Sequence, residues 1–505
     1  MDASREELED AIFHIVPHKP FPQYIDETVF LDLKSLLDQH PDKVFSSWAH
    51  DNPRLFLLLR MLGCDDDALY QKLDSENIGD FWLPFSTSTL EKLSSFTDIS
   101  AKDWRRAQFH VLSASEQMSE QKLISPIHAH RHIQNGNAHF EELETIGKGG
   151  SAEVTRVKHK LSGRFFACKR IIRGVEVKAQ RNQLIEFTTE VDVLKRVNHH
   201  HLVSLVASFT DLTSFSLILN PVAEDVLKSM LERQSRDQPL PDSDLTTLRR
   251  AFGCLATALA YLHEEGIRHK DIKPGNILLS DGQVYLCDFG ISRDWSKAEH
   301  STTEGEVMKF TRRYCAPEVF GRDPRNTKSD VWSLGCVFLE MITVCKGYVI
   351  EELNDFLLDA SAGASGQGLW CALDAMNAWL VKIRSEKNDS ADDIPLGWIT
   401  TMIRPEREDR TKASELVKLI STASGDLPRQ DLYIGSCCTR TNSAASMDSS
   451  DNTTFESSGF NDGLGKSLLR LARHLLYVLT ILQRRNPDCI YVSAYLSLLE
   501  PFTST

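Results

Sequence analysis

Apolar residues recur at helical spacing over the first 115 residues of the chain. The clearest stripes are Leu8, Ala11, Ile12 and Ile15, and then, after Asp26, Val29, Leu33 and Leu36. Intervals of three and four residues place side chains on one face of an α-helix, and Asp is a favourable N-cap residue. Residues 1–115 are therefore predicted to form a helical domain.

The pattern changes twice beyond this region. Residues 116–138 are more polar and are interpreted as a linker. Short apolar runs at 164–169 and 216–219 are then typical of strands, whereas 245–263 and 331–341 have the length and periodicity of helices. Strands followed by helices predict an α+β fold in two lobes, with the sheet in the smaller lobe.

The composition changes again after about residue 421. Ten of the twenty residues in 439–458 are Ser or Thr, so a disordered linker is expected over 422–462. Residues 463–505 regain a helical stripe, made by Leu468, Leu471, Leu475, Leu479 and Leu482. Arg470, Arg473 and His474 interrupt it, which favours an amphipathic tail helix that docks on protein over a transmembrane segment, with membrane-surface attachment as the alternative.

Composition and charge narrow the functional classes. The chain has 505 residues, enough for two to four domains, and a net charge of -14, which argues against a nucleic-acid-binding protein. Its acidic first residues have no apolar core and resemble neither a secretory signal nor a transit peptide, so a cytoplasmic or nuclear location is expected.

The cysteines and a run of three histidines need a separate interpretation. Eleven cysteines without paired metal-like spacing favour free thiols in a reducing compartment. The adjacent Cys437 and Cys438 are interpreted as ordinary thiols in a flexible segment. His199, His200 and His201 are interpreted as a loop, because neighbours in a turn point in different directions and have no second ligand cluster beside them.

Three polar motifs carry the chemistry. Residues 268–276 read Arg-His-Lys-Asp-Ile-Lys-Pro-Gly-Asn, residues 286–290 read Leu-Cys-Asp-Phe-Gly, and residues 315–318 read Cys-Ala-Pro-Glu. In this order and spacing they resemble the motifs of eukaryotic-type Ser/Thr protein kinases. The resemblance covers about residues 139–421 and implies a bilobal protein-kinase-like fold, flanked by the helical N-terminal domain. The wording of the first motif also resembles uncharacterised kinases from filamentous fungi.

The resemblance implies transfer of the ATP γ-phosphate to Ser or Thr hydroxyls of protein substrates, with Mg2+ as cofactor. Asp271 stands in the position of the catalytic base. Lys273, a marker of Ser/Thr over Tyr kinases, would neutralise charge on the moving phosphoryl group. Asn276 and Asp288 would supply oxygen ligands to Mg2+.

The nucleotide site is implied by the same resemblance. Lys169 is expected to reach the α and β phosphates and to pair with Glu190 rather than Glu186. A glycine-rich hairpin would cover the phosphates through Gly147, Gly149 and Ala152, where Ala152 replaces the family's third glycine. The adenine would lie between Val154, Ala167 and Leu278, with Leu219 behind it and Val222 in the hinge.

Further residues are expected to support and regulate the large lobe. Glu318 would pair with Arg410, and Asp330 would brace the catalytic loop. Lys270 replaces the family's usual Arg, which predicts modest dependence on phosphorylation of Ser301, Thr302 or Thr303. Lys309, Arg312 and Arg313 make the substrate-facing loop basic, which predicts a preference for acidic or phosphorylated substrates, with binding of a phosphate on the loop itself as the alternative role of these cations.

Two other functional classes share parts of this sequence pattern. A nucleotide-binding pseudokinase or scaffold would act through its flanking regions, with protein partners at the N-terminal domain and the C-terminal helix. The retained Lys169, Glu190, Asp271, Asn276 and Asp288 argue against that class. A small-molecule kinase is disfavoured because the peptide-positioning loop continues in full to Glu318.

Overall fold

A computed structural model gives the fold of the chain. It describes residues 5–40, 43–64, 66–113, 130–149, 152–289, 293–294, 312–321, 326–360, 368–386, 391–425 and 432–439. These residues belong to the first of two compact units, 1–442. The second unit, 443–505, includes the predicted tail helix and lies outside the described residues.

The N-terminal region is helical, as the apolar stripes predict. Its elements are α1 (Arg5–Ile15), α2 (Glu27–Leu37), α3 (Lys43–Asp51), α4 (Pro53–Met61), α5 (Asp67–Ser75), η1 (Asp80–Trp82), α6 (Thr87–Ser94), α7 (Ala101–Ala107) and η2 (Gln108–Val111). The expected N-cap is present, because Asp26 Oδ1 accepts a hydrogen bond from the Thr28 amide at 2.9 Å. The N-terminus of α4 is capped by a residue that is distant in the sequence. Asp80 accepts hydrogen bonds from the Arg54 and Leu55 amides at 3.0 and 2.8 Å.

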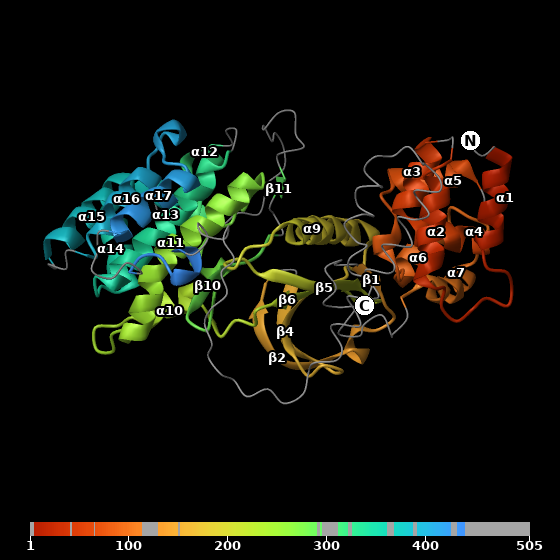
Figure 1. Ribbon diagram of the computed structural model, residues 1–505, viewed down its shortest axis with the longest axis horizontal. Coiled ribbons are helices and arrows are strands. Elements are labelled where there is room, and N and C mark those ends of the chain that lie inside the picture. Colours follow the sequence, from red (N-terminus) through yellow and green to blue (C-terminus); the bar gives the residue numbers. More distant parts are fainter. Residues whose placement is uncertain are drawn as a thin grey trace, which may run out of the picture. The chain divides into compact units, whose positions relative to one another are not determined.

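A six-stranded sheet forms the smaller lobe. Its elements are β1 (His130–His132), η4 (Gly136–Ala138), β2 (Phe140–Lys148), β3 (Ala152–His159), β4 (Phe165–Ile172), α9 (Val177–Arg196), β5 (Ser204–Thr210) and β6 (Ser214–Asn220). The strand order is β1-β5-β6-β4-β3-β2, and only the β1–β5 pair is parallel within this sheet. Helix α9 packs against β5 and β6 (Figure 1).

Strand β1 lies inside the segment expected to be a linker. His130, Arg131 and His132 pair with Ser208, Phe209 and Thr210. His132 is buried, and its Nδ1 lies 3.3 Å from the Leu83 carbonyl of the N-terminal domain. Residues 130–132 are thus part of the sheet, because hydrogen bonding to an edge strand orders even a polar segment.

The larger lobe is mainly helical. After β7 (Asp225–Val226) come α10 (Leu227–Arg233), α11 (Asp242–Glu264), β8 (Ile267–Arg268), η5 (Pro274–Asn276), β9 (Ile277–Ser280), β10 (Gln283–Leu286), β11 (Arg293–Asp294), η6 (Arg312–Tyr314) and α12 (Pro317–Phe320). The remaining elements are α13 (Lys328–Cys345), α14 (Ile350–Ala360), η7 (Leu369–Ala372), α15 (Leu373–Glu386), α16 (Ile394–Met402), η8 (Arg407–Asp409), α17 (Ala413–Gly425) and α18 (Ser436–Thr439).

Helix α13 forms the centre of this lobe. Nearly every residue from Ser329 to Cys345 is buried, which fits a helix that is apolar on all sides. Gly335 allows α16 to approach closely, since a Cβ at this position would lie 2.8 Å from the Met402 Cβ. Among the described helices, none is long and apolar enough to cross a membrane.

Part of the segment expected to be disordered is folded. Residues 432–439 pack along α11, where the Gly253 amide donates to the Tyr433 carbonyl at 2.7 Å. A Cβ on Gly253 would lie 2.6 Å from this carbonyl oxygen, so only glycine fits. Tyr433 is fully buried, and its hydroxyl donates to the Ala391 carbonyl at 2.6 Å. The prediction of disorder from composition was wrong for these residues, because burial of Tyr433 and Ile434 orders the chain.

The N-terminal domain contacts the smaller lobe beside α9. Arg173, which precedes α9, is buried and donates to the carbonyls of Trp82 and Pro84, both at 2.9 Å. Gln180 on α9 donates to Ser86 Oγ at 2.9 Å. The two contacts tie the segment from η1 to the start of α6 to α9, which carries Glu190, and to the residues just before α9.

We expect the Arg173→Ala substitution to weaken this attachment. Buried carbonyls that lose their donor cost about 1–3 kcal/mol, so the melting temperature should fall by several degrees. Phosphotransfer should also fall several-fold, because α9 loses part of its support. Differential scanning fluorimetry and an initial-rate assay check both effects. Lys178→Ala, which changes an exposed residue of α9, is the matched control. Equal effects of the two substitutions would contradict the prediction.

Candidate active site

Lys169 lies on β4, and its ammonium group contacts one acidic residue from each lobe. Its Nζ lies 2.7 and 2.8 Å from the two carboxylate oxygens of Glu190 on α9, and 2.8 Å from Asp288 Oδ1. Burial alone lowers the pKa of the Lys169 ammonium, but the two carboxylates raise it above its ordinary value. Lys169 is therefore a fixed positive charge. The predicted choice of Glu190 over Glu186 agrees with this geometry.

Asp288 follows β10 in a left-handed backbone conformation, with φ of 69°. Burial tends to raise the pKa of its carboxyl group, yet Lys169 holds it below the ordinary aspartate value. Its side chain is 44% exposed, so an oxygen remains accessible to a metal ion. An ionised, accessible carboxylate is the kind of ligand that Mg2+ requires.

Asp271 lies in the catalytic loop between β8 and η5. Its Oδ2 accepts hydrogen bonds from Lys273 Nζ at 2.5 Å and from Asn276 Nδ2 at 3.0 Å. Because the Asn276 amide nitrogen is turned to Asp271, the Asn276 side-chain oxygen is left as a metal ligand. The Cys287 amide donates to the Asn276 carbonyl at 3.1 Å, which holds the residue before Asp288 against Asn276. These residues fit a Mg2+ ion.

Strands β2 and β3 form the expected glycine-rich hairpin. Gly147 pairs with Val154, and the Gly149 amide donates to the Ala152 carbonyl at 2.8 Å. Residues 150–151 at its tip lie outside the described residues. Ala152 begins β3, so the residue that replaces the third glycine adopts an ordinary strand conformation.

The residues expected around adenine come from both lobes. Ala167 on β4 pairs with Leu219 on β6, and both side chains are buried. Val154 and Leu278 are partly buried and pack against the same core. The Val222 carbonyl accepts from Ser280 Oγ at 3.3 Å. Contact of these five residues with a nucleotide remains a prediction.

Asp330 on α13 supports the backbone of the catalytic loop. Its carboxylate accepts from the amides of His269 and Lys270 at 3.0 and 2.8 Å. Lys270 has a φ of 70°, and such a conformation needs support from its surroundings. His269 also lies beside Phe289, with ring centroids 5.2 Å apart. The predicted bracing role of Asp330 is confirmed.

Comparison with known proteins agrees with this geometry. The model of the protein kinase domain family matches residues 140–418, more than half of the chain. This chain belongs to the protein kinase family. It is 33% identical over 242 residues to the serine/threonine-protein kinase Sgk3 of Mus musculus. This matched segment covers 46% of this chain and 47% of the relative.

Two plant relatives match the kinase domain in the same way. Serine/threonine-protein kinase AtPK1/AtPK6 of Arabidopsis thaliana is 32% identical over 205 residues, 40% of this chain and 42% of the relative. Serine/threonine-protein kinase RUNKEL of the same organism is 32% identical over 220 residues, 43% of this chain and 15% of the relative. The chain thus spans less than half the length of each of these relatives.

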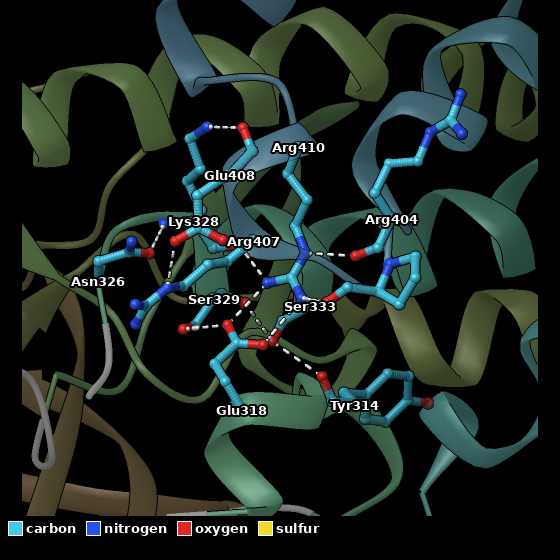
Figure 2. A network of polar contacts seen from close by, with 11 residues as sticks. Tyr314, Glu318, Asn326, Lys328, Ser329, Ser333, Arg404, Arg407, Glu408 and Arg410 are labelled. Atoms are coloured by element: carbon cyan, nitrogen blue, oxygen red, sulfur yellow. Dashed lines mark hydrogen bonds and ion pairs between the residues drawn. The ribbon is translucent and has the colours of Figure 1, made fainter. Parts of the chain in front are cut away.

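The predicted ion pair of Glu318 and Arg410 is present in the kinase domain. Arg410 Nη1 and Nη2 donate to the two Glu318 oxygens at 2.7 and 2.8 Å (Figure 2). Arg410 Nε donates to the Arg404 carbonyl at 2.6 Å, and Ser329 Oγ donates to Glu318 at 2.7 Å. The Arg410 guanidinium also lies 5.0 Å from the Trp332 ring. This bidentate, buried ion pair ties α12, which carries Glu318, to the segment after α16 in the large lobe.

The Glu318 pair predicts a pH-dependent stability. Burial alone raises the pKa of Glu318, but hydrogen bonds from Arg410 lower it below the ordinary value of 4.5. Its stabilisation is therefore complete above about pH 4.5 and is lost as pH falls through the lowered pKa. We expect Glu318→Gln to lower the melting temperature at about pH 7, with a smaller effect as pH falls below about 4.5. A difference between the two proteins that is constant with pH would contradict this.

Arg313 does not fit the predicted role in substrate selection. Its guanidinium donates to Glu340 Oε1 at 3.0 Å and to Asn354 Oδ1 at 2.6 Å. The Glu340 side chain is only 5% exposed, so Arg313 neutralises a buried carboxylate within the lobe. The prediction was wrong for Arg313, because its positive charge is already paired with Glu340 inside the lobe. Ser301, Thr302, Thr303, Lys309 and the Arg312 side chain lie outside the described residues.

Proposed function

We propose that the protein is an ATP- and Mg2+-dependent Ser/Thr protein kinase. The observation that carries this proposal is Lys169, which contacts Glu190 and Asp288 at once. Such a contact requires α9, β4 and Asp288, the second residue after β10, to be in the arrangement that binds and orients the nucleotide phosphates. The named activities of the curated relatives support the Ser/Thr specificity.

The residues of the site supply each part of the transfer. Lys169 would attract the nucleotide phosphates, and Asn276 and Asp288 would hold a Mg2+ ion that neutralises their negative charge. The Asp271 carboxylate orients the acceptor hydroxyl and accepts its proton. Lys273, 2.5 Å from Asp271, stabilises negative charge on the transferred phosphoryl group.

A direct assay tests this proposal. The purified full chain is incubated with labelled ATP, Mg2+ and a generic protein acceptor, and the acceptor is hydrolysed for phosphoamino-acid analysis. We expect phosphoserine and phosphothreonine, with the label lost when EDTA removes the metal. ATP binding by thermal shift without any phosphate transfer would favour the alternative, a nucleotide-binding scaffold.

The substrates are proteins in this proposal, and the cytoplasm or nucleus is the proposed location. The N-terminal domain is a second contact surface for partners, because Phe13 and Leu31 are 58% and 64% exposed. The predicted C-terminal helix is another, although it lies outside the described residues. Nucleic acid is not a proposed partner, given the net charge of -14.

A further inference from the structure

Two histidines lie close to two cysteines in the structure, although the two pairs are far apart in the sequence. His200 and His201 lie in the loop after α9, and Cys437 and Cys438 lie on α18. The sequence interpretation treated the histidines as a plain loop without a second ligand cluster. The loop placement is confirmed, but the expected absence of a second ligand cluster is wrong, because the folding of residues 432–439 against α11 supplies one.

The four ligand atoms of these residues converge. His200 Nε2 lies 3.2 Å from Cys438 Sγ, and His201 Nε2 lies 3.3 Å from Cys437 Sγ. All four atoms lie within 4.8 Å of one another. Zinc bonds of about 2.3 Å to sulfur and 2.0–2.1 Å to nitrogen place the corners of a tetrahedron about 3.3–3.8 Å apart. The observed cluster therefore approaches the size of a four-coordinate zinc site.

We propose that His200, His201, Cys437 and Cys438 bind one Zn2+ ion through these four atoms. Two thiolates and two imidazoles in a compact set favour zinc over Mg2+ or Ca2+, which prefer oxygen ligands. Four protein ligands leave no open position, so the site is structural rather than catalytic. It is separate from the Mg2+ site at Asn276 and Asp288, and it does not depend on the proposed kinase activity.

Neighbouring groups orient these ligands. His201 Nδ1 lies 2.8 Å from the Val284 carbonyl, which can only accept, so Nδ1 carries the hydrogen. This leaves the lone pair of Nε2 directed to the side of Cys437, as a metal-bound imidazole requires. Thr257 Oγ1, on α11, lies 3.1 Å from Cys438 Sγ, while its single hydrogen is directed to the Gly253 and Cys254 carbonyls at 3.0 and 2.9 Å. The bond from His201 to Val284 is the kind of outer hydrogen bond that accompanies a metal ligand.

A third thiol makes a competing use of the sulfurs possible. Cys254 on α11 is buried, and its Sγ lies 3.9 Å from that of Cys437 and 4.0 Å from that of Cys438. A disulfide to Cys254 would remove one zinc ligand. The exposed position of His200 gives a metal ion access to the other three ligand groups. Reducing conditions would keep the thiols available for zinc.

The proposed ion would connect two segments of the fold. It would connect α18 to the loop after α9, beside α11. In the same loop, the His201 carbonyl accepts from the Leu286 amide at 2.9 Å, two residues before Asp288. Zinc would therefore stabilise the connection behind the active site without touching the reacting groups.

The metal content of the unaltered full chain tests the proposal first. Protein purified under reducing conditions without chelators and supplied with ZnCl2 is desalted and analysed by inductively coupled plasma mass spectrometry. We expect one zinc per chain, with X-ray absorption showing two sulfur and two nitrogen neighbours. Protein that retains no zinc, an oxygen-rich coordination shell, or an intact disulfide at Cys254 in the reduced sample would overturn the proposal.

Substitutions then assign the ligands. The double change Cys437→Ser and Cys438→Ser should abolish stoichiometric zinc, and His200→Asn should lower zinc affinity at least about tenfold. Cys64→Ser, in the N-terminal domain, and His199→Asn, in the same loop, are matched controls that should retain one zinc. Retention of zinc by the double variant would overturn the assignment. If that variant does not fold, X-ray absorption of the unaltered chain still decides the question.

Discussion

Replacing Asp271 with Asn should lower kcat for protein phosphorylation by about 10²- to 10⁴-fold, the range for losing a positioned general base. The substitution keeps the size of the side chain and a hydrogen-bond acceptor. It removes the negative charge that lies 2.5 Å from Lys273 Nζ and that receives the acceptor proton. The KM for ATP should change little, because Lys169 and Asp288 are left in place.

The matched control for this prediction is Asp281→Asn. Asp281 is exposed in the turn between β9 and β10 and has a φ of 50°, a conformation that Asn tolerates well. It makes the same change of charge ten residues away along the chain. Initial rates with saturating Mg2+ and ATP measure both variants, and a thermal melt verifies that both are folded. Comparable rates for Asp271→Asn and the unaltered protein would show that Asp271 is not the base.

The polar centre of the site could be predicted from the sequence because its residues lie in short motifs. Asp271, Lys273 and Asn276 are within six consecutive residues, so local backbone geometry alone brings them together. The Lys169–Glu190 pair needed the family resemblance, since the two residues lie 21 positions apart on different elements, strand β4 and helix α9. Its geometry follows from the packing of α9 on the sheet.

Features that depend on tertiary contact could not be predicted. Arg313 reads as a substrate-facing cation in the sequence, yet it pairs with the buried Glu340 of a helix 27 residues further on. Composition predicts disorder over 422–462, but Tyr433 docks against Gly253 of α11. That docking also brings Cys437 and Cys438 to His200 and His201. Adjacent cysteines and adjacent histidines were the available signal, and only the fold shows that they meet.

Strand β1 illustrates the same limit at the other end of the domain. Its three residues, His130–His132, have no apolar alternation that would mark a strand. Their order comes from pairing with β5 and from contacts with the N-terminal domain around Leu83. A domain boundary drawn from polarity therefore falls after residues that already belong to the sheet.

Replacing Arg410 with Ala should destabilise the large lobe by about 3–5 kcal/mol, the usual cost of breaking a buried ion pair from one side. The Arg410 side chain is 0% exposed and that of Glu318 is 9% exposed, so the remaining carboxylate would lose its partner without gaining water. The carbonyls of Arg404 and Pro405 would lose donors as well (Figure 2). The midpoint of urea unfolding measures the change.

Two further variants separate the buried pair from a general effect of charge. Arg407→Ala removes another cation of the same loop, whose partner Glu408 is 68% exposed, and it should leave the unfolding midpoint within error. In the double variant Glu318→Ala with Arg410→Ala, the loss should be clearly smaller than the sum of the single losses, because no buried charge is left unpaired. Strictly additive losses would show that the two side chains stabilise the lobe independently, and that the arginine acts through its backbone carbonyl contacts and its packing on Trp332 instead.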